Sequence, residues 1–159
     1  MSKRRKRDVS SEPVELTITG MSHDGRGVAE LGGKKVFVHG ALPGEQVRAR
    51  LLARQRRYDD AEVVNILCAS PQRVEPRCAH FGVCGGCALQ HLDPAAQILG
   101  KQETLLQNLE RIGKVTPGRL LGALTGPAWN YRRKARLSAR YVIKKERLLI
   151  GFRERQGRY

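Results

Sequence analysis

The sequence predicts a mainly β chain that begins with a small closed barrel and continues through a cysteine-rich loop and one helix. The start of an α+β domain follows. In residues 9–67, short runs of alternating apolar and polar residues are separated by glycine and proline turns. Residues 68–93 hold cysteines but few aliphatic residues, and apolar residues recur at helical spacing from Pro94. These patterns are typical of strands, an irregular loop and a helix, in that order.

The barrel is predicted from five short strands. Alternating runs rich in β-branched residues include residues 14–19, 36–38, 47–52 and 61–67. Turns are indicated by the glycines within residues 24–27, by Gly32 and Gly33, and by Pro43 followed by Gly44, the order that a type II turn requires. Several short strands linked in this way favour a small barrel of the oligonucleotide-binding type.

One helix is predicted over residues 94–112. Asp93 fits the N-cap position, Pro94 the first helical position and Gly113 the stop. Apolar residues follow helical spacing at Ile98, Leu105, Leu106, Leu109 and Ile112. The helix therefore has one apolar face.

Residues 94–159 are predicted to form the start of a central domain. A link rich in glycine and proline occupies residues 113–127. Residues 133–141 and 148–152 are then expected to be two strands around a polar turn at residues 144–146.

The charge of the chain predicts a polyanionic partner. There are 30 Lys and Arg against 15 Asp and Glu, which gives a net charge of +15 and a pI near 10.4. The excess lies at the two ends: residues 1–8 form a basic tail, and residues 131–159 carry 11 basic against 2 acidic residues. Such concentration favours a phosphate-binding surface, although a charge run can also be a solvated face.

No run of residues is apolar and long enough for a membrane span, and residues 1–20 lack the apolar core of a secretion signal. We therefore expect a cytoplasmic protein without a membrane partner, and no obligate protein partner is predicted. Because disulfides are rare in that compartment, the four cysteines are better interpreted as metal ligands than as bridges.

Three of the cysteines are spaced as ligands of one inorganic centre. Cys78, Cys84 and Cys87 form a C-x5-C-x2-C pattern, and two glycines between the last pair let the backbone turn tightly. Zinc sites usually present two short cysteine pairs, so the wider first gap favours a 4Fe–4S cluster. Cys68 is expected to be a buried structural thiol. His80 or His91 could instead complete a Cys3His zinc site.

These residues resemble the 23S ribosomal RNA (uracil-C5)-methyltransferases. The resemblance covers nearly the whole chain after the basic tail. It is most specific in Pro76-Arg77-Cys78, in His80 to Cys87, and in Gln90-His91. The turn before Val28-Ala29 and the segment from Val36 to Glu45 resemble the TRAM domain of that family, a small RNA-binding barrel. Tyr131 to Ser138 and Gly151-Phe152-Arg153 resemble the start of its central domain.

The resemblance implies what the chain would bind. The family's 4Fe–4S cluster places its first three ligands at Cys78, Cys84 and Cys87, and its fourth at a cysteine soon after Gly151-Phe152-Arg153, which the chain up to Tyr159 lacks. S-adenosylmethionine, the nucleophilic cysteine and the catalytic base would belong to a C-terminal domain expected beyond residue 159. The implied reaction adds the thiolate to C6 of a flipped-out uracil, methylates C5 and removes the C5 proton.

Two groups of residues are expected to hold 23S ribosomal RNA. Basic residues of the central segment would contact phosphates, and a second patch would lie on the barrel. The predicted RNA-binding residues are Arg132, Arg133, Lys134 and Arg136 in the first group, and Arg54, Arg56, Arg57 and Tyr58 in the second. Trp129, Tyr131 and Phe81 could stack on unpaired bases or simply be packed.

Two other functions remain open on these residues. One is a non-enzymatic RNA-binding module stabilised by zinc. The other is a radical enzyme of the methylthiotransferase kind, which also pairs a TRAM domain with a cluster; the C-x3-C-x2-C spacing typical of those enzymes differs from the spacing here.

Overall fold

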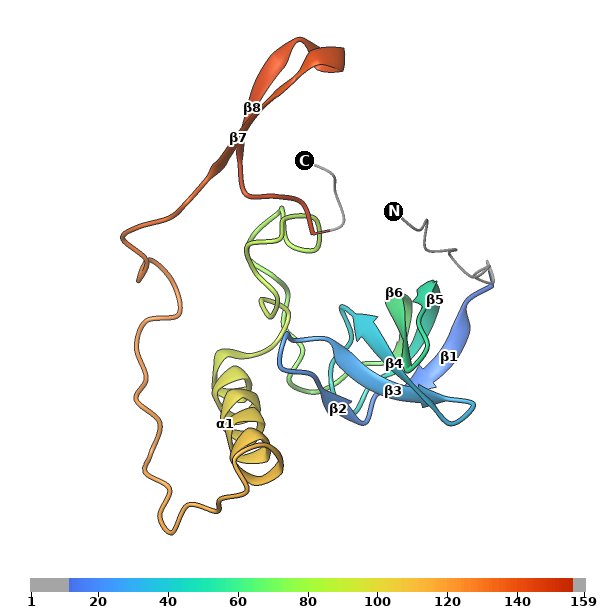
Figure 1. Ribbon diagram of the computed structural model, residues 1–159, viewed down its shortest axis with the longest axis vertical. Coiled ribbons are helices and arrows are strands. Elements are labelled where there is room, and N and C mark those ends of the chain that lie inside the picture. Colours follow the sequence, from blue (N-terminus) through green and yellow to red (C-terminus); the bar gives the residue numbers. More distant parts are fainter. Residues whose placement is uncertain (1–11, 156–159) are drawn as a thin grey trace.

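The structure is a computed structural model that describes residues 12–155. The basic tail predicted at residues 1–8 lies outside the described residues. Within them the chain is mainly β, as predicted: a six-stranded sheet is followed by a long loop, one helix and a two-stranded sheet (Figure 1). The described residues contain no helix long and apolar enough to cross a membrane.

The six-stranded sheet closes into a barrel. Its strands are β1 (Val14–Thr17), β2 (Gly20–Met21), β3 (Gly27–Leu31), β4 (Lys34–His39), β5 (Gln46–Arg54) and β6 (Tyr58–Cys68). Their order is β1-β5-β6-β4-β3-β2, and only β4 and β6 pair in parallel. β1 and β2 are the two edge strands of this order, yet they follow each other directly along the chain. The two edges therefore meet, and the sheet closes on itself.

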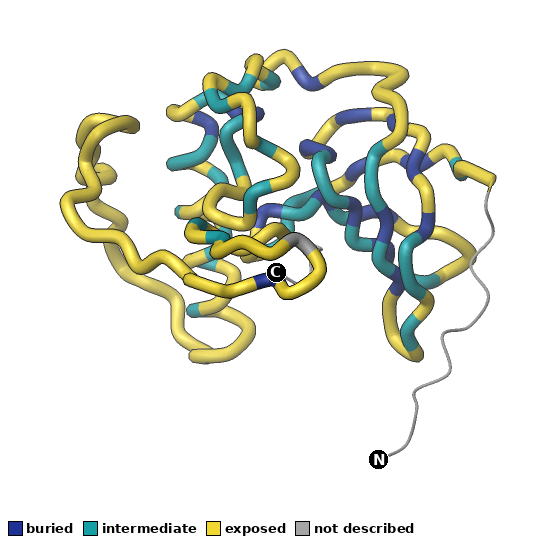
Figure 2. The backbone as a smooth tube through the Cα atoms, turned by 90° about the horizontal axis from the view of Figure 1, so that it is seen from above, coloured by how far each residue is buried: buried dark blue, intermediate teal, exposed yellow. Residues whose placement is uncertain are grey.

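The barrel interior is the main core. In β5 the burial of side chains alternates from Val47 to Leu51, which is the period of a strand with one face inside. Ten buried residues form the core: Leu16, Ile18, Ala29, Val36, Val38, Ala41, Val47, Ala49, Leu51 and Ala61. Figure 2 shows that burial concentrates in the barrel, whereas most of the remaining chain is exposed.

Two turns of the barrel follow the sequence prediction. Gly32 and Gly33 both have positive φ, the conformation of a two-residue hairpin turn between β3 and β4. Gly44 has a φ of 84°, and the Glu45 amide donates to the Leu42 carbonyl at 3.2 Å, so residues 42–45 form a type II turn.

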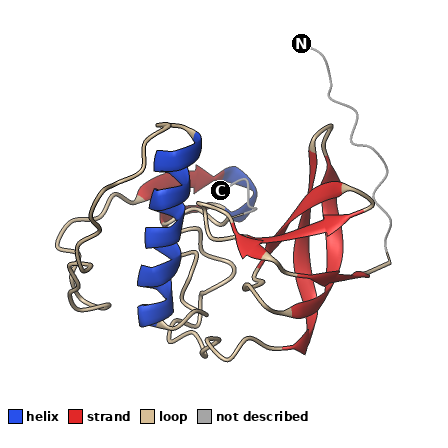
Figure 3. Ribbon diagram, turned by 90° about the horizontal axis from the view of Figure 1, so that it is seen from below, coloured by secondary structure: helices blue, strands red, loops and turns tan. Residues whose placement is uncertain are grey.

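A second, smaller core joins the barrel to the helix. Leu42, Leu92 and Ala96 are buried together, with Met21 and Leu89 packed against them. Figure 3 shows the helix beside the barrel, with the loop of residues 69–93 between the two. The C-terminal end of this loop is therefore held by apolar contacts of Leu89 and Leu92.

The helix α1 spans Pro94–Arg111, close to the prediction. The Asp93 side chain accepts hydrogen bonds from the amides of Ala95 and Ala96 at 2.9 and 3.3 Å, so it is the N-cap. The helix ends as predicted, with Ile112 as the C-cap and Gly113 directly after it. The residue that leaves the helix with positive φ is Lys114, at 54°, and the Val115 amide then donates to Leu109 at 3.0 Å.

After α1 the chain runs without regular structure to a hairpin. The hairpin consists of β7 (Ser138–Val142), a short 3-10 turn (Ile143–Lys145) and β8 (Arg147–Gly151). The strand predicted over residues 133–141 is therefore wrong for its first part. Residues 133–137 have no strand beside them in the described chain, so no ladder of hydrogen bonds forms there.

Candidate nucleic-acid interface and cysteine loop

Tyr58 lies on the outer face of the barrel in a fixed arrangement. Its ring meets the edge of Phe37 with centroids 5.3 Å apart, and the Arg26 guanidinium lies 4.5 Å from the Phe37 centroid. Arg26 is itself held by Asp24 and Asp60, at 2.9 and 2.6 Å. Tyr58 nevertheless stays 38% exposed. The sequence pattern does not indicate Phe37 or Arg26 as its supports, since they come from other strands and turns.

The arginines near Tyr58 differ in ion pairing from those further along β5. Arg48 pairs with Glu15 at 3.0 Å, and Arg50 pairs with Glu62. The predicted binding residues Arg54, Arg56 and Arg57 are exposed at the tip of the β5–β6 hairpin and form no ion pair within residues 12–155. Their charges are therefore available to an external anion.

The second predicted basic group precedes β7. All four of its side chains, those of Arg132, Arg133, Lys134 and Arg136, are exposed. Arg132 lies 5.7 Å from the Tyr131 centroid, and none of the four forms an ion pair with a described residue. Because residues 131–137 are not a strand, these side chains do not alternate between the two faces of a sheet.

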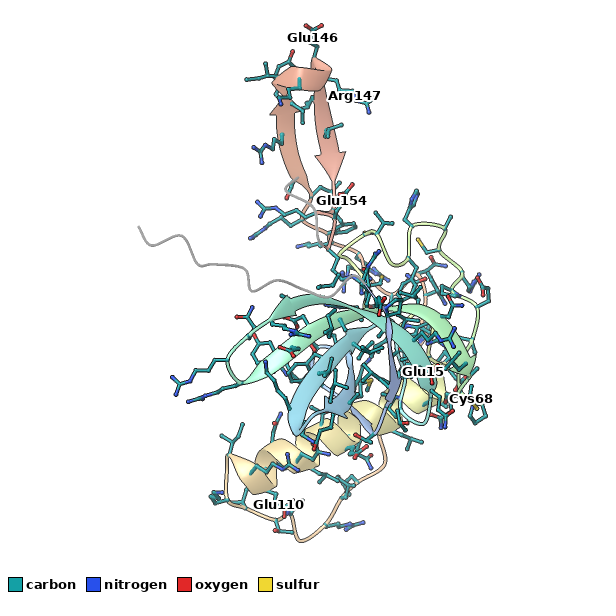
Figure 4. The ribbon with its side chains drawn as sticks, turned by 90° about the vertical axis from the view of Figure 1, so that its right-hand side faces the viewer. Glu15, Cys68, Glu110, Glu146, Arg147 and Glu154 are labelled. Carbon is teal, nitrogen blue, oxygen red and sulfur yellow. The ribbon has the colours of Figure 1, made fainter. Side chains whose placement is uncertain are left out.

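The structure does not bring the two basic groups together. In Figure 1 the tip between β5 and β6 belongs to the barrel, whereas the segment leading into β7 lies on the other side of the molecule. In Figure 4 the β7–β8 hairpin projects away from the barrel, with Glu146 and Arg147 at its tip and Glu154 near its base. A ligand that contacts both groups must therefore be extended, as a nucleic acid is.

The cysteine loop is shaped by its own backbone. The Phe81 amide donates to the Cys78 carbonyl at 3.0 Å, and the Cys84 amide donates to the His80 carbonyl at 2.9 Å. Gly82 has a φ of 89°, which favours glycine. The Gly86 amide donates to the sulfur of Cys84 at 3.3 Å, the kind of contact that stabilises a thiolate.

The chain returns to this loop after the hairpin. The Gly85 amide donates to the Arg153 carbonyl at 2.8 Å, and the Arg155 amide donates to the Val83 carbonyl at 2.9 Å. The Arg155 guanidinium also donates to Gly82 at 2.7 Å. A Cβ at Gly85 would lie 2.8 Å from the Arg153 carbonyl, so only glycine allows this approach. The segment that follows Gly151 is thus fixed beside Cys84.

The cysteines themselves are accessible to different extents. Cys78 and Cys84 are half-buried and Cys87 is exposed. Cys68, expected to be buried, is exposed at the end of β6, because the last residues of that strand extend beyond the barrel core (Figure 4). Within residues 12–155, no three Cys, His, Asp or Glu side chains gather closely enough to hold a metal ion.

The donor set nevertheless fits a thiolate-bound centre in its chemistry. One loop carries three thiols, and an amide already donates to one of the sulfurs. Of the two histidines considered for zinc, His80 is exposed and His91 is only 2% exposed. Neither imidazole nitrogen of His91 has a hydrogen-bond partner among the described residues, and its ring packs on Phe81 at 5.2 Å.

A buried ion pair joins the loop to the barrel. Glu45 is fully buried and accepts from Arg73 at 2.6 and 2.8 Å, and from the amides of Leu42 and Ser70. Burial alone would raise the pKa of Glu45, but these hydrogen bonds outweigh it and lower the pKa. Burial, with the nearby charge of Arg73, lowers the pKa of His91 to about 4.

Comparison with known proteins assigns the barrel to a domain family and shows which proteins the whole chain resembles. The TRAM domain model matches residues 12–64. The 23S rRNA (uracil(1939)-C(5))-methyltransferase RlmD of Xanthomonas euvesicatoria is 57% identical over 150 residues, which are 92% of this chain and 34% of that protein. The protein of the same name from Stenotrophomonas maltophilia strain K279a is 53% identical over 162 residues, covering 100% of this chain and 36% of its own length.

The chain thus spans about one third of the length of these relatives. Both similarities run through the barrel, the cysteine loop and the helix, as the high coverage of this chain requires. The chain contains a TRAM domain, and its sequence is similar to the N-terminal part of proteins named 23S rRNA (uracil-C5)-methyltransferases.

Proposed function

We propose that the chain is the RNA-recognition part of a cytoplasmic, S-adenosylmethionine-dependent methyltransferase that forms 5-methyluridine in 23S ribosomal RNA. The observation that carries this proposal is the identity of 53–57% to relatives named for that activity, extending over 92–100% of the chain. Under this proposal, the site for S-adenosylmethionine, the nucleophilic cysteine and the catalytic base would lie in the part of the relatives' length that this chain does not span.

In this proposal the chain binds the RNA and positions it for the reaction. Flipping a uracil out of its stack costs a few kcal/mol, and contacts to the surrounding phosphates offset that cost. The exposed, unpaired arginines at the barrel tip supply such contacts, and the basic segment of residues 132–136 supplies them at a second place. Because the two groups lie apart, together they fix the RNA in one orientation (Figure 1).

Methyl transfer by the protein encoded by the complete reading frame tests the activity. The substrate is 23S rRNA lacking its 5-methyluridines, and the product nucleoside is identified by mass spectrometry. We expect 5-methyluridine to form, and the rate to fall at least tenfold when the cationic groups at 54–57 and 132–136 are replaced by glutamine. Failure to form 5-methyluridine, or its formation on other RNA only, would overturn the proposal.

Within the same proposal, Cys78, Cys84 and Cys87 are three ligands of a 4Fe–4S cluster. The support is their spacing, the lack of an aliphatic core around residues 76–88 and the amide that donates to the Cys84 sulfur. A bound cluster would hold the loop in one shape; uracil methylation by this route needs no electron transfer. Gly85 and Arg155 keep the segment after the hairpin beside Cys84, the direction from which a fourth ligand would come.

Anaerobic purification of the same full-length protein, with iron, sulfide and zinc analysis, tests the metal assignment. We expect about four irons per chain and broad absorbance near 400 nm. Cys84→Ser should lose the iron and weaken RNA binding, whereas the matched control Cys68→Ser should retain both, because Cys68 lies on the barrel. Stoichiometric zinc without iron would contradict the cluster and favour the alternative, a zinc-stabilised RNA-binding module with His80 or His91 as a ligand.

A further inference from the structure

An arginine of the cysteine loop is stacked on a tryptophan from the distant link. The Arg77 guanidinium lies 4.9 Å from the centroid of the Trp129 ring, a cation–π contact between residues 52 positions apart. Trp129 is still 40% exposed. The contact therefore holds the indole in place while part of its surface remains open to a ligand.

The backbone beside Trp129 is in an uncommon conformation. Asn130 has a φ of 59°, one of three non-glycine residues with positive φ among those described. Asparagine adopts this left-handed conformation more readily than most residues. Asn130 separates Trp129 from Tyr131, a residue that is 63% exposed and whose ring lies near the Arg132 guanidinium.

A basic side chain lies beside each of these two rings, Arg77 beside Trp129 and Arg132 beside Tyr131. Arg77 is exposed and forms no ion pair with any described residue, as is true of the cations from Arg132 to Arg136. Exposed aromatic rings next to free cations are the composition of a surface for single-stranded nucleic acid, in which bases stack on rings and phosphates contact the cations.

We propose that Trp129, held by Arg77, stacks on an unpaired base of single-stranded RNA, with Tyr131 and Arg132 as the adjoining contact. This inference rests on the proposed function and deepens it, because it names unpaired bases as the ligand of this surface. Arg77 directly precedes Cys78, whose amide donates to Gln90 at 3.3 Å. The shape of the cysteine loop therefore sets the position of Arg77, and through it the stacking surface.

The chain offers a direct probe, since Trp129 is its single tryptophan. The 159-residue chain is titrated with a single-stranded oligoribonucleotide and with a duplex RNA of equal length, while tryptophan fluorescence and an independent binding signal are recorded. We expect the single strand to quench Trp129 emission in step with binding, and the duplex to quench it much less.

Variants separate stacking from charge. Trp129→Leu should lower the affinity for the single strand roughly 5- to 150-fold, with the salt dependence unchanged, because stacking neutralises no phosphate. Trp129→Phe should recover most of the affinity, and Arg77→Ala should reduce both affinity and quenching. Tyr141→Leu is the matched control, an exposed aromatic on β7 outside this surface, and should bind as the original chain does.

The results of these titrations test the stacking of Trp129 separately from RNA recognition by the chain. Binding of full affinity by Trp129→Leu, without quenching in the original chain, would overturn the stacking inference and leave the RNA-recognition proposal standing. Equal quenching by duplex RNA would overturn the assignment to unpaired bases. Absence of any RNA binding by the folded chain would overturn both.

Discussion

Arg73 reaches from the start of the cysteine loop to Glu45 in the barrel, and two of its nitrogens lie 2.6 and 2.8 Å from the two carboxylate oxygens. The same guanidinium donates to the Gly40 carbonyl at 2.7 Å. Glu45 is fully buried and the Arg73 side chain is 21% exposed, so the pair ties the barrel to the loop in a largely dry place. The orientation of the loop against the barrel depends on this contact.

Arg73→Met should destabilise the protein by about 3 kcal/mol, because it leaves the carboxylate of Glu45 buried with only two amide donors. Chemical denaturation measures the change in the free energy of unfolding. Lys35→Ala removes an ion pair whose side chains are 58% and 55% exposed and should change stability little. Equal effects of the two substitutions would show that the buried pair does not hold the fold.

The stability of the protein should fall as the pH decreases from about 6.5 to about 4. His91 has a pKa near 4 when folded, whereas an unfolded histidine titrates near 6.5, so the unfolded chain binds more protons in this window. The stabilisation that depends on neutral His91 is complete above pH 6.5, and its loss at low pH lowers the free energy of unfolding by about 3 kcal/mol.

His91→Leu should flatten that pH dependence, as measured by denaturation at several pH values. A smaller dependence of the same sign should remain, because burial and the nearby Arg155 also lower the pKa of His39. An unchanged curve in the variant would mean that His91 is not the group responsible.

Arg56→Ala combined with Arg57→Ala should weaken binding to RNA and reduce its salt dependence. Removing one phosphate-binding cation lowers the slope of log affinity against log salt by about one. Arg48→Ala is the control: it is also an exposed arginine of the barrel, but its charge is paired with Glu15. A larger effect from Arg48 than from the hairpin tip would place the barrel's RNA contact elsewhere.

Gly27→Ala should destabilise the barrel by about 1–3 kcal/mol. A Cβ at this buried position would lie 2.9 Å from side-chain carbons of Ala41 and Ile18, inside the core. Gly20→Ala tests the same change nearby, where no heavy atom lies within 4 Å, and should have little effect. Thermal or chemical unfolding that ranks the two substitutions in the opposite order would contradict the packing described for β3.

Local signals made much of the fold predictable from the sequence. The Pro43-Gly44 turn and the Asp93 cap depend on residues a few positions apart, and both were predicted correctly. Contacts between distant residues were not predictable. Nothing in the sequence pairs Arg73 with Glu45 or brings Arg153 to Gly85, because tertiary folding alone brings them together.

In the candidate site, too, local features were predictable and contacts between distant residues were not. The exposure of the predicted arginines at the barrel tip follows from their charge, but the support of Tyr58 by Phe37 depends on a parallel pairing of β4 with β6. The strand predicted at residues 133–137 failed because a strand needs a neighbour, and alternation alone does not supply one.

The affinity of the 159-residue chain for 23S ribosomal RNA, measured as a function of salt concentration, shows whether the two basic groups bind RNA phosphates. We expect saturable binding whose log affinity falls linearly and steeply with log salt, and a shallower line when Arg56, Arg57, Arg132 and Lys134 are replaced by glutamine. Absence of binding at low salt, or an affinity that salt does not change, would contradict this expectation.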